Sequence, residues 1–137
     1  MVIQESITLR TKGRGFTELS DRIQSVVQQA SVATGVCHLF LQHTSASLIL
    51  CENADPSVRR DLEQFFSHLV TDGDPRFSHS AEGPDDMPAH IRAILTQNDM
   101  SIPITNNRLV LGTWQGIYLW GHRTTPHQRR LTITIYG

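Results

Sequence analysis

The sequence predicts an α+β domain of mostly antiparallel, β-sandwich-like sheets with about three helices. Three observations lead to this fold class. Short apolar runs with strand character lie on both sides of a central region with helical periodicity. The strands of the last third follow one another without crossover helices. The length of 137 residues suits one hydrophobic core and not two, so a single domain is expected over residues 1–137.

The first half of the chain contains three predicted strands and one helix. Residues 2–10 alternate loosely between polar and apolar side chains, as in a half-buried strand. From Phe16 to Ala30, apolar residues recur at spacings of three and four, which predicts an amphipathic helix. The apolar runs at 36–42 and 45–50 are too short for helices, so they are predicted to be strands.

The second half begins with a well-marked helix. Asp55 offers a side-chain acceptor at the cap, Pro56 suits the first helical position, and apolar residues from Val58 to Leu69 supply a buried face. Residues 70–84 show no periodicity and predict a long loop, and residues 87–97 predict a third helix that buries Ile91, Ile94 and Leu95. Four strands are then expected, at 101–105, 108–112, 114–120 and 129–136.

Composition argues against several kinds of partner and location. The formal charge of −1 gives no global attraction to nucleic acid or to a membrane surface. No apolar run approaches the roughly 18 residues of a membrane span, and the amino end lacks the pattern of a signal peptide. Cys37 and Cys51 lie in apolar runs without the spacing of a disulfide framework. These features predict a cytoplasmic protein.

The first polar cluster, His43-Thr44-Ser45, lies at the joint between two apolar strands. If the strand at 36–42 continues, His43 lies on the same face as Leu39 and Leu41. A buried imidazole must be hydrogen-bonded, so its partner is the protein itself, a ligand or a metal.

A second cluster, Glu52-Asn53-Ala54-Asp55, ends the next strand. Asp55 is explained as a helix cap, whereas local structure leaves Glu52 without a role. If the strands at 36–42 and 45–50 form a hairpin, Glu52 should lie near His43.

The third cluster combines His79 with Glu82, Asp85, Asp86 and His90. Asp86 and His90 are four residues apart across a helix start, so their side chains can meet on one face. This spacing suits two metal ligands, and equally a capping carboxylate beside its helical neighbour. Three histidines (with His43) and one oxygen donor would make a common catalytic zinc arrangement, although the spacing lacks the regularity of a H-E-x-x-H motif.

Two further segments offer polar or aromatic groups to a ligand. Between Gly112 and Gly116, Trp114 is either core filler or a plate for stacking a ring, and Gln115 can both donate and accept. Arg129 and Arg130 open the last strand and point to opposite faces, so at most one enters a given pocket. Solvated edge charges are the alternative for this pair. No G-x-S-x-G elbow supports nucleophilic catalysis.

Taken in order, these residues resemble the YjbQ-like family of small bacterial and archaeal proteins, also called secondary thiamine-phosphate synthases. The matching segments are His43-Thr44-Ser45-Ala46-Ser47-Leu48, Glu52-Asn53-x-Asp55, His79-x-x-x-Gly83-x-Asp85-Asp86-x-x-x-His90, Ile102-Pro103-Ile104 and Gly112-Thr113-Trp114-Gln115. The resemblance covers almost the whole chain. The sequence departs from the family at Cys51, where Asn is frequent, and near Gly121, where an acidic residue is common.

The resemblance implies a homotrimer with pockets at subunit interfaces and a metal-capable cluster at His43, His79 and His90. It also implies a metal-assisted transferase acting on small phosphorylated heterocycles. In such a reaction a pyrimidine diphosphate and a thiazole phosphate give thiamine phosphate, here as a side activity. The expected cofactor is a divalent metal, zinc with magnesium as the alternative, and the expected partner is a small phosphorylated metabolite.

On this interpretation each polar cluster has a role. Asp86 or Glu52 completes or orients the metal shell, as the catalytic carboxylates. The expected ligand-binding residues are Thr44, Ser45, Asn53, Thr113, Trp114, Gln115, Arg129 and Arg130. The alternative is a non-catalytic, metabolite-binding trimer with a structural metal. An open ligand position beside the histidines favours the enzyme, whereas a closed shell of four protein ligands favours the binding protein.

Overall fold

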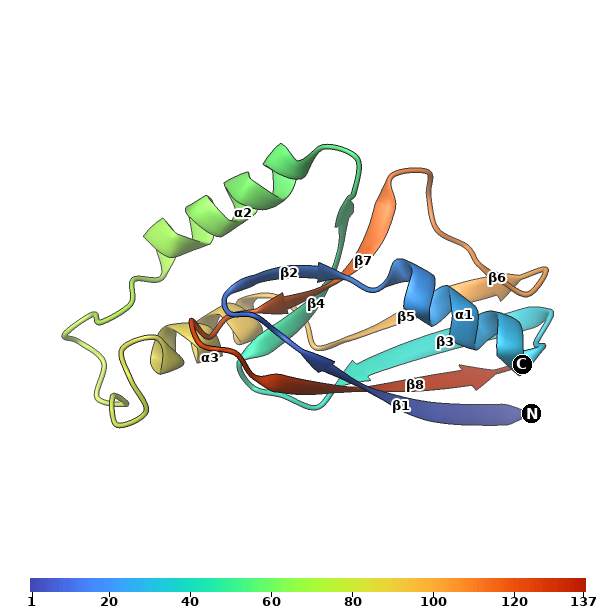
Figure 1. Ribbon diagram of the computed structural model, residues 1–137, viewed down its shortest axis with the longest axis horizontal. Coiled ribbons are helices and arrows are strands. Elements are labelled where there is room, and N and C mark those ends of the chain that lie inside the picture. The colour runs from blue at the N-terminus through green and yellow to red at the C-terminus, as the bar shows by residue number, and fades with distance from the viewer.

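Two antiparallel sheets face each other in the computed structural model, which describes all residues from 1 to 137 (Figure 1). The larger sheet has the strand order β1-β8-β3-β5-β6 and the smaller one β2-β7-β4. The elements are β1 (Val2–Arg10), β2 (Gly15–Glu18), α1 (Ser20–Ala30), β3 (Thr34–Leu41), β4 (Ala46–Glu52), α2 (Pro56–Leu69), α3 (Asp86–Leu95), β5 (Asp99–Thr105), β6 (Arg108–Leu109), β7 (Gln115–Gly121) and β8 (Gln128–Tyr136). The predicted α+β class with three helices is confirmed.

The hydrophobic core lies between the two sheets and α1. In strand β8, successive side chains point alternately into and out of this core. Leu131, Ile133 and Ile135 are fully buried, and the residues between them face outward. Neighbouring strands β1 and β3 pair with β8 in antiparallel register. Helix α1 closes the core with one apolar face, through Ile23 and Val27.

The predicted helix over residues 16–30 begins later than expected. Residues Gly15–Glu18 form β2, which pairs with β7 and places Phe16 opposite Trp120. Their rings stack with centroids 4.6 Å apart. The spacing from Phe16 to Leu19 fits a helix, but the cross-strand contact with Trp120 gives Phe16 a better packed environment.

The expected hairpin of the strands at 36–42 and 45–50 is wrong. Strand β3 pairs with β5 on one side and β8 on the other, so both its edges are already hydrogen-bonded. The chain therefore crosses to the smaller sheet, where β4 pairs with β7. At a rise of roughly 3.3 Å per residue, Glu52 lies about 20 Å along β4 from Ala46. Glu52 is consequently not a neighbour of His43.

The outer face of the smaller sheet carries aromatic and polar groups beneath the helices. Trp120 contacts the ring of Phe66 on α2, with centroids 4.9 Å apart. His122 is fully buried just after β7, and its Nε2 atom lies 2.8 Å from the hydroxyl of Ser47. Burial, reinforced by the charges of Arg92 and other arginines, lowers the pKa of His122 to about 3. His122 is therefore neutral at physiological pH.

Helix α2 begins as predicted but is not buried as predicted. The Asp55 side chain accepts from Ser57 N at 2.9 Å, and Pro56 occupies the first turn. No residue of α2 is buried, and Phe65 and Leu69 are 63% and 56% exposed. The smaller sheet beside this helix has only three strands, and the exposure of Phe65 and Leu69 shows that the chain leaves part of the apolar face of α2 uncovered.

Two other predictions change in detail. The expected burial of Ile91, Ile94 and Leu95 in α3 is wrong, because Ile94 and Leu95 are 81% and 54% exposed and Ile91 is only half-buried. The fully buried residues of this helix are Ala89 and Arg92, and Arg92 Nη1 pairs with Glu63 at 2.6 Å. The strand expected at 108–112 is only the two residues of β6. As expected, no helix is both long enough and apolar enough to span a membrane.

Candidate functional site

Polar segments that are far apart in the sequence meet at one end of the two sheets. The backbone N–H of His122 donates to Ser45 O at 3.1 Å, which joins the end of β7 to the segment between β3 and β4. The N–H of Gln42 donates to Arg130 O at 3.2 Å, which joins the same segment to β8. Helix α3 and the loop before it lie beside these joints (Figure 1).

His79, Asp86 and His90 form a compact cluster at this end. Asp86 is the first residue of α3 and His90 lies one turn later, whereas His79 comes from the preceding loop. Asp86 Oδ2 lies 2.6 Å from His79 Nε2 and 3.2 Å from His90 Nε2. One ligand atom from each of the three residues lies within 4.8 Å of the other two. Such a cluster can hold one metal ion between two imidazoles and a carboxylate.

The three side chains of the cluster differ in their exposure to solvent. The Asp86 side chain is 3% exposed, whereas those of His79 and His90 are 46% and 31% exposed. The expected meeting of Asp86 and His90 across one helical turn is confirmed. The capping alternative is not, because the cap residue is Asp85 and it makes no side-chain cap hydrogen bond.

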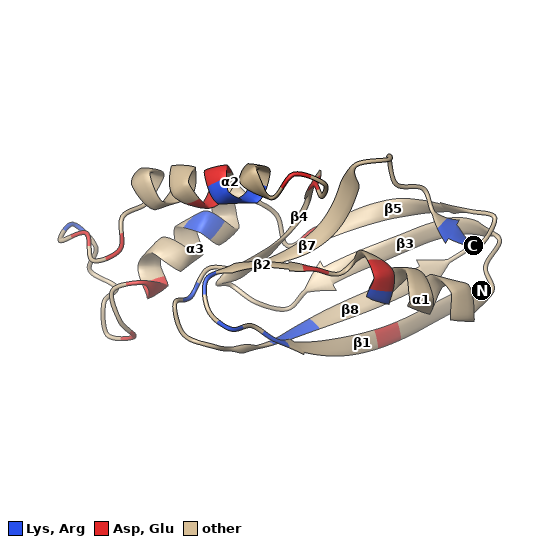
Figure 2. Cartoon of the chain, turned by 45° about the horizontal axis from the view of Figure 1, so that its top comes forward, with Lys and Arg blue, Asp and Glu red and all other residues tan.

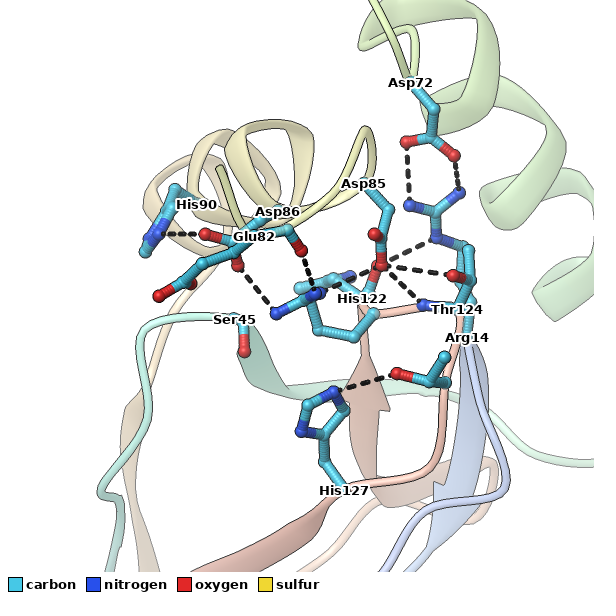
Figure 3. Close-up of polar contacts among 12 residues, drawn as sticks. Arg14, Ser45, Asp72, Glu82, Asp85, Asp86, His90, His122, Thr124 and His127 are labelled. Atoms are coloured by element: carbon cyan, nitrogen blue, oxygen red, sulfur yellow. Dashed lines mark hydrogen bonds and ion pairs between the residues drawn. The ribbon is translucent and has the colours of Figure 1, made fainter. Parts of the chain in front are cut away.

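Arg123 braces the two adjacent carboxylates of Asp85 and Asp86. Its Nε donates to Asp85 Oδ2 and its Nη1 to Asp86 Oδ1, each at 2.9 Å. Its Nη2 donates to the backbone oxygen of Glu82 at 2.9 Å. Figure 3 shows the dashed contacts that converge on Asp85 and Asp86. One guanidinium group thus ties the loop, the start of α3 and the segment after β7 together.

These contacts keep both carboxyl groups ionised. Burial alone would raise the pKa of Asp85, but hydrogen bonds from Thr124 N and Arg123 outweigh it and lower this pKa to about 2. Burial likewise opposes ionisation of Asp86, and contacts with His79, Glu82 and Arg123 still lower its pKa. An ionised Asp86 is the form that can bind a metal ion.

A second arginine anchors the other side of the long loop. Arg14 Nη1 and Nη2 donate to the two carboxylate oxygens of Asp72 at 2.8 and 2.9 Å, as Figure 3 shows. The N–H of Gly73 donates to Pro84 O at 2.9 Å and closes the loop on itself. Residues 70–84 are therefore a loop as predicted, held in place by Arg14 and Arg123.

His43 lies outside the three-residue cluster, which corrects the expected convergence of His43, His79 and His90. Its Nε2 atom accepts a hydrogen bond from the backbone N–H of Arg130 at 2.7 Å. Burial, followed by the charges of Arg129 and Arg130, lowers the pKa of His43. Within one chain, the side chains close enough together to share one metal ion are thus those of two histidines and Asp86.

His43 nevertheless borders the same space as His90. A pocket of about 390 Å³ is lined by His43, Thr44, His90, Ala93, Ile94, Thr96, Gln97 and Asn98. Thr44, one of the predicted ligand-binding residues, is exposed in the lining of this pocket. A ligand in this pocket would contact both an imidazole of the cluster and the segment after β3.

Arg129 and Arg130 point to opposite faces of β8, as the alternation predicted. The expectation that at most one of them enters a given pocket is wrong, because both line a pocket beside His43 at the start of the strand. Arg129 is 3% exposed, whereas Arg130 is exposed. Ser45 holds Arg129, since its hydroxyl accepts from Nη1 at 2.9 Å and its carbonyl oxygen accepts from Nη2 at 3.2 Å. Because β8 lies between β1 and β3, these are not charges on a sheet edge.

The other predicted site residues gather at the far end of β4 and β7. Glu52 pairs with Gln115 in the sheet, and its Oε2 accepts from Asp55 N at 2.7 Å, which explains it as part of the helix start. The N–H of Asn53 donates to Trp114 O at 3.0 Å. Thr113 is exposed in the turn beside them, and Trp114 is 61% exposed and is not core filler. These residues do not share a pocket with His79 or His90.

Sequence reasoning missed Arg123, Arg14 and His122. All three act on partners distant in sequence: Arg123 contacts Asp86 across 37 positions and Arg14 contacts Asp72 across 58. The available signal was the adjacent pair Asp85-Asp86, which needs nearby cations if both side chains are buried. That signal indicates a cation but does not identify which of eleven arginines supplies it.

Comparison with known proteins places this arrangement in context. The model of a family described as UPF0047 protein YjbQ-like matches residues 5–137. A UPF0047 protein of Synechocystis sp. is 52% identical over 98% of this chain and 91% of its own length. UPF0047 protein YjbQ of Escherichia coli O157:H7 is 43% identical over 100% of this chain and 99% of that protein.

Solved structures agree with the fold. A yjbq/upf0047 protein of Clostridium acetobutylicum is 30% identical and superposes with a TM-score of 0.84, covering 98% of this chain and 99% of that one. A hypothetical protein of Aeropyrum pernix K1 superposes with a TM-score of 0.89 over 98% of both chains. At 22% identity, the second similarity concerns the fold alone.

Proposed function

The chain belongs to the UPF0047 family of YjbQ-like proteins, and from this premise we propose that it is a divalent-metal-dependent transferase. The proposed substrates are small phosphorylated heterocycles, joined as in thiamine-phosphate synthesis. The observation that carries the proposal is the cluster of His79, Asp86 and His90, whose ligand atoms lie within 4.8 Å of one another beside a pocket.

The donor set fits a divalent ion. Two imidazoles and one carboxylate are common protein ligands of catalytic zinc, which leaves a fourth position for water or substrate. The structural alternative needs a closed shell of four protein ligands, and this cluster supplies three. Asp86 Oδ1 is held by Arg123, which leaves Oδ2 facing both histidines. We expect zinc, with magnesium as the alternative.

The proposed reaction needs charge neutralisation more than a protein nucleophile. The thiazole nitrogen attacks the carbon that carries the diphosphate on the pyrimidine. A carbon–nitrogen bond forms while the carbon–oxygen bond breaks, and pyrophosphate leaves with the bonding electrons. A divalent ion, when bound, supplies positive charge to the leaving group.

The side chains of this chain have separate tasks in that reaction. His79, His90 and Asp86 would hold the ion, and Arg123 orients Asp86 and keeps it ionised. The pocket beside His90 offers apolar contact from Ala93 and Ile94 and polar contact from its remaining residues. A heteroaromatic ring that needs both kinds of contact suits this lining.

Metal analysis of variants tests the proposal. His79→Ala, His90→Ala and Asp86→Asn should each lower zinc affinity by roughly a hundredfold or more, because each removes a ligand rather than an outer partner. Thiamine-phosphate formation should fall in parallel. His38→Ala is the matched control, since His38 also lies beside a carboxylate, 3.1 Å from Asp99, but on the outer face of the larger sheet. It should change neither quantity.

The outcomes separate the two functional classes. Variants that keep their thermal melting temperature but lose metal and activity support the enzyme. Variants that unfold when the metal is lost indicate a structural metal and a non-catalytic binding protein. Variants that retain full activity would refute the assignment of the metal site.

We also propose that three copies assemble into a homotrimer. Helix α2 has no buried residue, and Phe65, Leu69 and Ile94 expose apolar surface on neighbouring helices. Apolar surface of this kind is usually covered by a partner. Light scattering at low micromolar concentration should give three times the chain mass, and Phe65→Ser with Leu69→Ser should dissociate the assembly. A monomeric parent would refute the trimer.

A further inference from the structure

Arg129 is a buried cation without an anionic partner. Its side chain is 3% exposed, on the face of β8 that also presents Leu131 to the core. No Asp or Glu forms an ion pair with Arg129, and its Nε atom has no hydrogen-bond partner. Burying a charge is costly unless an opposite charge compensates it. The protein alone does not supply this compensation.

His43 presents a second donor beside Arg129. The backbone N–H of Arg130 donates to His43 Nε2 at 2.7 Å, so Nε2 must be the unprotonated nitrogen. In the neutral imidazole the proton then resides on Nδ1. Arg129 Nη1 directs an N–H at Nδ1 over 3.5 Å, a contact that a protonated Nδ1 cannot accept. An anion oxygen beside the two nitrogens would accept from both after a small reorientation and would remove this mismatch.

These two donors border an open pocket that is lined only by polar and charged residues. Its volume is about 330 Å³, and its lining residues are Thr8, Gln42, His43, Gln128, Arg129 and Arg130. Every one of them can donate a hydrogen bond, and none carries a negative charge. Thr8 and Arg130 are register partners on adjacent strands, which places Arg130 beside the hydroxyl. Figure 2 shows basic residues gathered where β8 begins beside the end of β1.

We propose that Arg129, His43 Nδ1–H and Arg130 form a subsite for the phosphate group of a small metabolite. Two guanidinium groups and an imidazole N–H can contact several oxygens of one anion, which suits a phosphate better than a carboxylate. Ser45 acts as a positioning residue here, because its hydroxyl and carbonyl oxygen fix the guanidinium of Arg129.

The position of His43 connects the phosphate subsite to the pocket beside the metal cluster. His43 lines this polar pocket and also the pocket shared with His90, so one residue borders both spaces. The substrate would then carry a phosphate at Arg129 and its reactive part near His79 and His90. This link rests on the proposed function, whereas the phosphate subsite rests on the surroundings of Arg129.

A purely structural role for Arg129 accounts for less of the geometry. The hydrogen bonds to Ser45 use two of its N–H groups but leave its charge uncompensated. They also leave unexplained why Arg130 and His43 line the same pocket as Arg129. A structural anchor requires no neighbouring donors.

Calorimetric titration with inorganic phosphate tests the subsite. Metal-free protein is used, so that binding through a metal is excluded. Arg130→Gln is exposed and should retain the fold, and it should bind phosphate about tenfold more weakly or worse, as expected for losing a charged hydrogen-bond donor. Arg129→Gln should abolish measurable binding. Arg108→Gln is the control, since Arg108 is an exposed arginine on β6 of the same sheet, and it should match the parent.

Two further measurements distinguish a free phosphate ion from a phosphorylated metabolite, and the phosphate subsite from the proposed transferase function. A small organic phosphomonoester should bind at least as tightly as inorganic phosphate; weaker binding would mean that the pocket takes the free anion only and would overturn the metabolite assignment. Asp86→Asn should lose metal while keeping phosphate affinity. Metal-independent activity with phosphate binding intact would refute only the proposed function. Absent phosphate binding in the parent, or unchanged binding in Arg130→Gln, would overturn the subsite itself.

Discussion

Arg123 Nη1 donates to Asp86 Oδ1 at 2.9 Å, on the oxygen opposite to the one that His79 and His90 approach. The guanidinium therefore fixes the plane of the carboxylate, and Oδ2 faces the two imidazoles. A group that orients a metal ligand in this way controls metal affinity without touching the ion.

Arg123→Gln should therefore weaken zinc binding by roughly 10–100-fold, the usual effect of losing an outer partner. Competition with a chromophoric chelator measures the change. Arg14→Gln is the matched control, because it also releases the long loop, at Asp72, but does not contact Asp86. Its zinc affinity should equal that of the parent. Equal losses in both variants would mean that loop order, and not the orientation of Asp86, sets the affinity.

His122 should make the protein acid-sensitive in a defined range. Its pKa is about 3 in the folded chain, against 6.5 for an unperturbed histidine. The unfolded chain binds the proton more readily, so the stabilisation is complete above pH 6.5 and is lost as pH falls toward 3. Each pH unit in this range removes up to about 1.4 kcal/mol from the free energy of unfolding.

Urea denaturation of the parent and His122→Gln between pH 7 and 4 measures this effect. The amide of Gln can still bond to Ser47 but cannot titrate. The variant should show the shallower loss of stability, by up to about 1.4 kcal/mol per pH unit. Parallel curves would show that another group is responsible.

Local sequence patterns predicted the parts of the fold and site that depend on neighbours in sequence. Asp55 and Pro56 start α2 as expected because capping involves only the next few residues. Asp86 and His90 meet because one helical turn separates them. The alternation along β8 correctly separated Arg129 from Arg130, since strand geometry fixes it.

Features that depend on the choice of strand partners could not be read from these patterns. His43 and Glu52 were expected to meet because their strands are consecutive, but β3 and β4 join different sheets. The spacing of Phe16 fits a helix, and only its contact with Trp120, which the sequence pattern does not show, explains why Phe16 lies in a strand. The helical face of α2 is apolar in sequence whether or not the chain itself covers it.

Gly35→Ala should destabilise the chain through a steric clash. A Cβ atom at Gly35 would lie 2.2 Å from the backbone oxygen of Tyr136, an atom held in the β3–β8 ladder. Overpacking of this kind typically costs about 1–3 kcal/mol. The free energy of unfolding should fall by that amount, while the neighbouring exposed Thr34→Ala should change it by less than about 0.5 kcal/mol. Equal stability of parent and Gly35→Ala would show that the two strands separate without cost.

Arg129→Met should stabilise the protein in phosphate-free buffer and remove its response to phosphate. The substitution removes a buried charge that has no anionic partner, which should raise the free energy of unfolding by about 1 kcal/mol or more. The lost hydrogen bonds to Ser45 oppose this gain, so Ser45→Ala is measured beside it and should lower stability by about 1 kcal/mol. Urea denaturation of the three proteins with and without phosphate measures both effects, and phosphate should stabilise the parent but not Arg129→Met. If Arg129→Met is instead less stable than the parent without phosphate, Arg129 serves the fold by holding Ser45 and its charge is not kept for a ligand.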